Sequence, residues 1–288
     1  MIYLTMNDPF IDSKYLSELR KILISYPSLA QVLGVPAQFT VVLDANLAIS
    51  DLMHLVEHPT LKQTAIQECI RSNVLRVCAP TWLEEEMTKS TIPQVARKKG
   101  YSEADLHTLW LEYRELIVWD DKFCRATFET EGAVDEKDIP YVELEKRIQA
   151  AGILSRDKDV KQLGGRALGL EFVLRSRRYA RSETCFISIY VNGTFLGAMG
   201  FAVLSVILRG VGLLVSRLPD WGRCILIVSV VTAVLHPKSR QYIFDKLASL
   251  EEAGTGLLPQ ILALIEFANQ EHENAEKTLL ETKELIVR

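Results

Sequence analysis

Two hydrophobic patterns alternate along the first part of the chain. Residues 39–43 (FTVVL) form an apolar, largely β-branched run without a polar face, typical of a central parallel strand buried on both sides. Further strands are predicted at 74–78, 117–119 and 152–155, and helices at 13–26, 46–57, 60–72, 81–89, 102–117 and 138–151. This alternation predicts an α/β fold in which a central parallel sheet carries helices on both faces, giving three layers, α/β/α.

The pattern is less decisive beyond residue 166. The segments LGLEFVL and CFISIYV each have the composition of a late strand, and the basic segment 175–181 separates them. We place the end of the α/β domain in this region. The expected organisation is a helical N-terminal extension at 1–37, an α/β domain at 38–184 and an α-helical C-terminal module at 185–288.

The C-terminal module contains two apolar runs, 195–215 and 224–235, joined by a short Pro-Asp-Trp turn. Basic residues on both sides would place the ends of a membrane hairpin at 195–235 in the cytoplasm and associate it with an inner membrane. Against this, the first run carries Arg209, and the second is about five residues short of the roughly 20 that a span needs. A buried helical hairpin or a homo-oligomer interface is the alternative.

Composition narrows the functional classes only slightly. The net charge of −4 and the isoelectric point of 5.8 give no general attraction for nucleic acid, so its binding would need a local basic patch or metal ions. The five cysteines are scattered and never form a CxxC pair, which argues against a disulfide framework or a structural zinc. The first ten residues lack the pattern of a secretory signal, so we expect a cytoplasmic domain.

Acidic residues follow two of the predicted strands. Asp44 comes directly after the first strand and is followed by Asn46, which can hold a carboxylate or a metal-bound water. Asp157 follows the strand at 152–155, after Ser155. Because ligands of parallel sheets bind beyond the carboxyl ends of the strands, these side chains are candidates for one site.

Two further carboxylates complete the candidate set. Glu86 lies in the helix after Pro80, and Asp138 opens the helix at 138–151. Carboxylates that converge from separate elements form a cage for hard divalent cations such as Mg²⁺ or Mn²⁺. Such a cation can activate water and neutralise charge on a phosphodiester, which predicts a hydrolase acting on nucleic acid.

Four short motifs carry a resemblance to the PIN-domain nucleases, which include many toxin-antitoxin ribonucleases. The motifs are VVLDAN, APTWLEEEM, EKDIPYV and ILSRDKD, in the family's order and over about half of the chain. The resemblance implies Mg²⁺- or Mn²⁺-dependent cleavage, of RNA more than DNA, and a possible inhibitory antitoxin-like protein. It implies the following roles: Asp44, Glu86, Asp138 and Asp157 as catalytic metal ligands, Asp159 as a further ligand, and Asn46, Glu85 and Ser155 in support.

Several alternatives stay open at this level. Glu85 is the fallback for Glu86, and Asp135 and Asp159 are the fallbacks for Asp138 and Asp157. Taken singly, Asp44 and Asp138 each have an ordinary interpretation as helix N-caps, and the Glu84–Glu86 run as a solvated helix face. The non-enzymatic alternative is a scaffold of the same fold that binds RNA or protein, and a third is a membrane-tethered effector whose hairpin gates the nuclease.

Other chemistry is sparse. Arg156 and Lys158 flank Asp157 and are candidates for contacts to nucleic-acid phosphates, as are the basic segments 97–99 and 175–181. His54 and His58 stand four residues apart, but His58 precedes Pro59 at a helix end, so we expect surface residues rather than metal ligands. No nucleophile-elbow pattern and no glycine-rich phosphate loop occur in the sequence.

Overall fold

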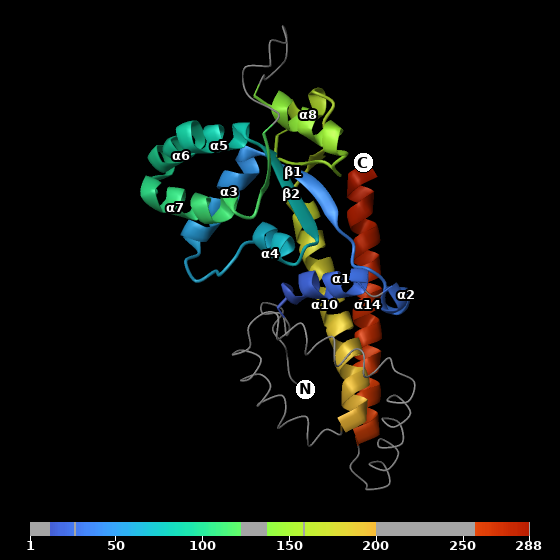
Figure 1. Ribbon diagram of the computed structural model, residues 1–288. Helices are drawn as coiled ribbons and strands as arrows, with labels where there is room; N and C mark the ends of the chain where they lie inside the picture. Colours follow the sequence, from blue (N-terminus) through green and yellow to red (C-terminus); the bar gives the residue numbers. More distant parts are fainter. Residues whose placement is uncertain (1–11, 26, 122–136, 158, 200–256, 288) are drawn as a thin grey trace. The chain divides into compact units, whose positions relative to one another are not determined.

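The computed structural model describes residues 12–25, 27–121, 137–157, 159–199 and 257–287 (Figure 1). The chain divides into two units. The α/β unit joins Pro36–Ala180 to Lys277–Arg288, and the helical unit comprises the residues up to Val35 together with Arg181–Glu276. The boundaries expected from the sequence, after residues 37 and 184, stay predictions.

A five-stranded sheet forms the centre of the α/β unit. Its strands are β1 (Phe39–Leu43), β2 (Leu75–Pro80), β3 (Val118–Asp120), β4 (Ile153–Leu154) and β5 (Ala167–Leu168). All neighbours pair in parallel, in the order β3-β2-β1-β4-β5, which confirms the α/β class and the central parallel sheet. Val41, Val42 and Leu43 are fully buried, as expected for a central strand.

The strand order changes direction between β1 and β4. From β1 the chain builds outward through β2 to β3, and it then returns to add β4 and β5 on the other side of β1. Gly152 precedes β4, and a Cβ atom there would lie only 2.6 Å from the backbone oxygen of Arg166. A glycine therefore lets β4 enter the sheet between β1 and β5.

Short helices connect the strands. They are α3 (Ala45–Glu57), α4 (Ala65–Arg71), α5 (Trp82–Glu86), the π-helical η1 (Met87–Thr91), α6 (Ile92–Lys99), α7 (Glu103–Arg114), α8 (Ile139–Ile148) and α9 (Asp159–Gln162). α4 and α5 contact β2, α8 contacts β1, β2 and β4, and α7 contacts α3 and α6. Thr64 and Ser102 begin α4 and α7 with side-chain cap hydrogen bonds, which fixes where these helices start.

The helical run that contains Glu86 is longer than the sequence predicted. We expected a helix at 81–89, but helical structure continues from Trp82 to Lys99 through η1. Pro93 lies in the first turn of α6, directly after η1. A π-helical turn widens the backbone just before that proline, so the chain stays helical where a regular α-helix would clash.

The expectation of late strands after residue 167 was wrong. Only Ala167–Leu168 is a strand, and both LGLEFVL and CFISIYV lie mainly or wholly in one helix, α10 (Leu170–Met199). The ring of Phe172 packs against that of Phe39 at 5.5 Å, and the Tyr179 hydroxyl accepts a 2.7 Å hydrogen bond from the Ala37 amide. Phe172, Tyr179 and the buried Ser176 between them are spaced by four and three residues, as on one face of a helix. A short apolar run does not by itself distinguish this helical spacing from a strand.

The helical unit begins with α1 (Tyr15–Ser25) and α2 (Pro27–Leu33), in agreement with the predicted helical preface. The later part of α10, and α14 (Leu257–Val287) as far as Glu276, also belong to it. Most of the expected hairpin 195–235 lies outside the described residues. In the part of the chain that is described, no helix has both the length and the apolar character that a membrane span requires.

Candidate active site

The carboxyl ends of β1 and β4 meet at Asp44 and Ser155. The Ser155 hydroxyl donates a hydrogen bond of 2.5 Å to Oδ2 of Asp44 and accepts one of 2.9 Å from the Asp157 backbone N–H. The backbone also joins the two ends, because the Asp44 N–H donates to the Leu154 carbonyl at 3.2 Å. The two sequence motifs that contain Asp44 and Asp157 are therefore joined at the point where the strand order reverses.

Asp44 is a buried carboxylate, with only 3% of its surface exposed. Burial raises its pKa, and the negative charge of Asp157 raises the pKa further. The Ser155 hydroxyl and the nearby N–H groups of Asn46 and Ala45 act in the opposite direction and stabilise the charged form. The site thus holds two acidic groups that repel each other, an arrangement that a cation would stabilise.

Asp44 and Asp138 each stand at the start of a helix. Both occupy the N-cap position, of α3 and α8 respectively, and neither makes a side-chain cap hydrogen bond. Thr64 and Ser102 do make such bonds at their helices. Neither aspartate therefore shows the hydrogen bond of a typical cap, although the N–H groups of Asn46 and Ala45 stabilise the charged Asp44 carboxylate and both aspartates are buried.

Tyr141 binds one of the four candidate acids and lies in the electrostatic field of two more. Its buried hydroxyl donates a 2.7 Å hydrogen bond to Oε2 of Glu86. Burial and the nearby charges of Glu86, Asp44 and Asp138 raise the pKa of Tyr141 well above its usual value. This tyrosine was not among the residues predicted from the sequence, although it stands in the EKDIPYV motif one helical turn after Asp138, where an i, i+3 neighbour is expected.

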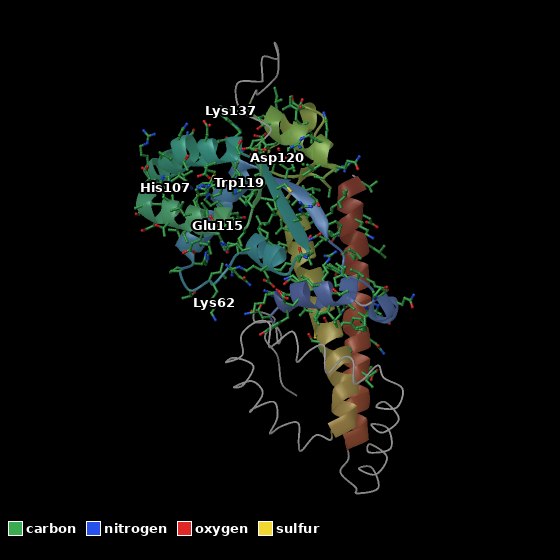
Figure 2. All side chains as sticks on the ribbon, in the orientation of Figure 1. Lys62, His107, Glu115, Trp119, Asp120 and Lys137 are labelled. Carbon is green, nitrogen blue, oxygen red and sulfur yellow. The ribbon has the colours of Figure 1, made fainter. Side chains whose placement is uncertain are left out.

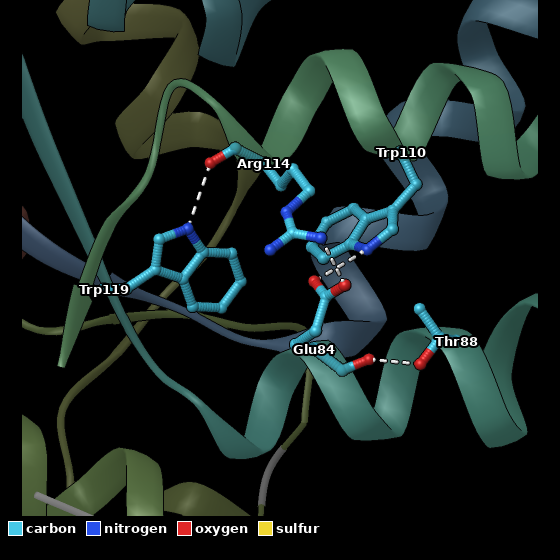
Figure 3. A network of polar contacts seen from close by, with 5 residues as sticks. All are labelled: Glu84, Thr88, Trp110, Arg114 and Trp119. Atoms are coloured by element: carbon cyan, nitrogen blue, oxygen red, sulfur yellow. Dashed lines mark hydrogen bonds and ion pairs between the residues drawn. The ribbon is translucent and has the colours of Figure 1, made fainter. Parts of the chain in front are cut away.

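The three glutamates at the start of the helical run point to three different environments. Glu84 accepts hydrogen bonds from Trp110 Nε1 at 3.0 Å and from Arg114 at 2.8 Å (Figure 3). Glu85 is exposed and pairs with Lys89 at 3.1 Å. Successive helical positions differ by about 100°, so only Glu86 reaches Tyr141. This geometry favours Glu86 over Glu85 as the member of the site.

The structure does not bring three of the described candidate carboxylates, Asp44, Glu86, Asp138 and Asp157, to within 4.8 Å of one another. In the described ranges, the one group of three or more His, Cys, Asp or Glu side chains with ligand atoms within 4.8 Å of one another is His54, Glu57 and His58. Mg²⁺ commonly keeps several waters and takes only one or two carboxylates directly. By its chemistry an all-oxygen set of this kind suits a hard cation that keeps part of its water.

The other candidate residues differ in how far the structure describes them. Asn46 is exposed in the first turn of α3. Arg156 is exposed and lies close enough to Asp51 to lower the pKa of that carboxyl group, against a larger effect of burial that raises it to about 6. Lys158 and Asp135, like the side chain of Asp159, fall outside the described residues.

Two further charged residues, Arg175 and Asp120, are engaged in ion pairs within the protein. Arg175 belongs to the basic segment 175–181, a candidate for phosphate contacts. It forms ion pairs with Glu171 and, at 3.3 Å, with Glu281, so its charge is compensated within the protein. Asp120 ends β3 at the same carboxyl edge of the sheet and was not among the predicted residues (Figure 2). It pairs with Arg147 at 2.5 Å, so its charge is compensated by α8.

Comparisons with models of protein families, with curated proteins and with solved structures find no match to this chain. The resemblance to PIN-domain nucleases therefore rests on the four motifs.

Proposed function

We propose that the α/β unit is a metal-dependent nuclease with a PIN-like active site at the carboxyl ends of β1 and β4. The observation that carries this proposal is the hydrogen-bonded chain from Asp44 through Ser155 to Asp157, located where the strand order reverses. In open parallel sheets, ligands bind in the crevice formed at such a reversal. Two acidic groups at this position, one of them the buried Asp44, suit a cation better than they suit an anionic substrate alone.

Asp44, Glu86, Asp138 and Asp157 would hold Mg²⁺ or Mn²⁺, with Asp159 as a further ligand. When bound, the cation supplies an activated water and neutralises charge on the phosphodiester oxygens. Ser155 keeps Asp44 oriented and favours its ionised form. Tyr141 holds Glu86 toward the other acids. Arg156, and Lys158 beside it in sequence, would contact phosphates of the substrate.

The preferred substrate is RNA, because the motifs resemble those of ribonucleases. The decisive experiment incubates the purified full chain with end-labelled RNA and DNA of the same sequence, with Mn²⁺, Mg²⁺ or EDTA. We expect cleavage that requires metal and is faster on RNA. Asp44→Asn and Asp157→Asn should each reduce the rate by about 100-fold or more, the size typical of losing a group that stabilises transition-state charge.

Glu143→Gln is the matched control, because Glu143 is an exposed carboxylate on α8. It should leave the rate unchanged. A second pair separates the neighbouring glutamates: Glu86→Gln should lower the rate strongly, and Glu85→Gln should not. Unchanged metal-dependent cleavage in both the Asp44 and the Asp157 variants would remove the site from the chemistry. RNA binding without cleavage would favour the scaffold alternative.

A further inference from the structure

A second group of ligand-type side chains lies at the end of α3. His54, Glu57 and His58 each offer one ligand atom, and these atoms lie within 4.8 Å of one another. The two imidazole rings are 4.3 Å apart between centroids. Histidines four residues apart on a helix face the same side, and the residue at the third position lies beside them. All three side chains are exposed, so an ion can reach them from solvent.

Two hydrogen bonds orient these ligands. His58 Nδ1 lies 3.0 Å from the backbone carbonyl of His54 and must donate to it, which leaves Nε2 with the free lone pair. The Tyr101 hydroxyl donates a hydrogen bond of 2.5 Å to the Glu57 carboxylate. Tyr101 follows Gly100, the residue that ends α6. Metal-binding imidazoles and carboxylates typically have such outer hydrogen bonds, which fix the tautomer and the direction of the ligand.

The position on the helix also favours a cation. α3 ends at Glu57 and His58 is its C-cap, so the last carbonyl groups and the negative end of the helix dipole lie beside the cluster. Tetrahedral zinc with bonds of about 2.0–2.1 Å separates its ligand atoms by roughly 3.4 Å. The ligand atoms lie within 4.8 Å of one another, and small rotations about the χ angles of exposed side chains would bring them to the shorter zinc spacing.

We propose that His54, Glu57 and His58 form a binding site for a borderline transition-metal ion, Zn²⁺ foremost, separate from the carboxylates at β1 and β4. Two imidazoles and one carboxylate suit Zn²⁺, Co²⁺, Ni²⁺ or Cu²⁺, whereas an all-oxygen set suits Mg²⁺ and Mn²⁺. Three protein ligands leave a fourth position for water or an external ligand. The expectation that the two histidines lie on the surface was right. The proposal departs from the expectation that they are not metal ligands, because they lie together with Glu57.

The test is calorimetric titration of the purified full chain, kept reduced, with Zn²⁺. His54→Gln and His58→Gln should each weaken binding at this site by at least about 10-fold, while Tyr101→Phe should weaken it by about 10-fold through Glu57. His107→Gln is the control, because His107 lies on α7 and is not part of the cluster (Figure 2). It should leave Zn²⁺ binding unchanged. Asp44→Asn should leave Zn²⁺ binding intact, so the result does not depend on the nuclease proposal.

Co²⁺ gives an independent readout. Its visible absorption should report nitrogen and oxygen ligands without a thiolate charge-transfer band, and it should disappear in the His54 and His58 variants. Unfolding curves without metal should be the same for wild type and variants, since the histidines are exposed. Equal Zn²⁺ affinity in wild type and both histidine variants, or a thiolate band that persists in them, would overturn the proposal.

Discussion

The Ser155 hydroxyl donates its hydrogen bond to Asp44 across the boundary between β4 and β1, at 2.5 Å, while both side chains are almost fully buried. Replacing Ser155 with alanine removes a partner of a buried charged group. We expect the free energy of unfolding at neutral pH to fall by about 1–3 kcal/mol. The pKa of Asp44 should rise further, because this hydrogen bond now lowers it.

Urea unfolding and NMR titration of the Asp44 carboxyl measure these two effects. Thr108→Ala is the control, since the Thr108 hydroxyl bonds only to a carbonyl of its own exposed helix turn. It should change stability by no more than about 0.5 kcal/mol. A Ser155→Ala protein that keeps both its stability and the Asp44 pKa would show that this bond does not join the two strand ends in solution.

Tyr141 is expected to position Glu86 rather than to react. Tyr141→Phe keeps the ring in its buried place and removes only the hydroxyl that donates to Glu86. We expect kcat for RNA cleavage to fall about 10-fold, with KM nearly unchanged, as is usual when the outer partner of a metal ligand is lost. The required Mn²⁺ concentration should rise at the same time. A variant with wild-type kcat and metal dependence would contradict this role.

Much of the sheet and the place of Asp44 at its carboxyl edge could be predicted, because both follow from local patterns. A β-branched run such as 39–43 has few alternatives to a buried strand, and an acid directly after it must lie at the carboxyl edge of the sheet. The order of β4 beside β1 is a matter of long-range pairing, which no local pattern encodes. The hydrogen bond from Ser155 to Asp44 could therefore not be predicted from the sequence.

The remaining differences arise where tertiary contacts decide between local alternatives. LGLEFVL has the composition of a strand, but Phe172 gains a ring contact with Phe39 as part of a helix. Three adjacent glutamates look equivalent in sequence, and only their partners Trp110, Lys89 and Tyr141 separate them. Side-chain partners of this kind depend on helices that are distant in the chain.

Glu84 is expected to stabilise the fold rather than to take part in cleavage. Its carboxylate joins α5 to α7 through Trp110 and Arg114 (Figure 3). In Glu84→Ala the fully buried indole N–H loses its acceptor, which should cost about 1–3 kcal/mol. The ion pair adds only about 0–1 kcal/mol, because the Arg114 side chain is 36% exposed and screened by solvent.

Chemical denaturation of Glu84→Ala beside Glu85→Ala measures the difference. The exposed pair of Glu85 with Lys89 should contribute no more than about 0.5 kcal/mol. Cleavage per folded molecule should be the same in both variants. Equal stability of the two proteins would show that the contact with Trp110 contributes nothing.

Glu183 makes the stability of the helical unit depend on pH. This glutamate on α10 is buried, and burial, with a smaller effect of Glu276, raises its pKa from 4.5 to about 7. The folded protein therefore holds this proton more tightly than the unfolded chain. His272 Nδ1 lies 4.0 Å from the same carboxylate, so a protonated His272 would oppose part of the shift.

Between pH 4.5 and about 7, the folded state binds more protons at Glu183 than the unfolded state does. Stability from this group is fully present below pH 4.5 and declines as the pH rises through that window, by up to about 3 kcal/mol. Glu183→Gln removes the titrating group and keeps the size of the side chain. Urea unfolding at pH 5 and pH 8 should therefore show a smaller loss of stability in the variant than in wild type, by roughly 1–3 kcal/mol. If both proteins lose the same amount between these two pH values, Glu183 titrates normally in the folded state and its burial has no effect on stability.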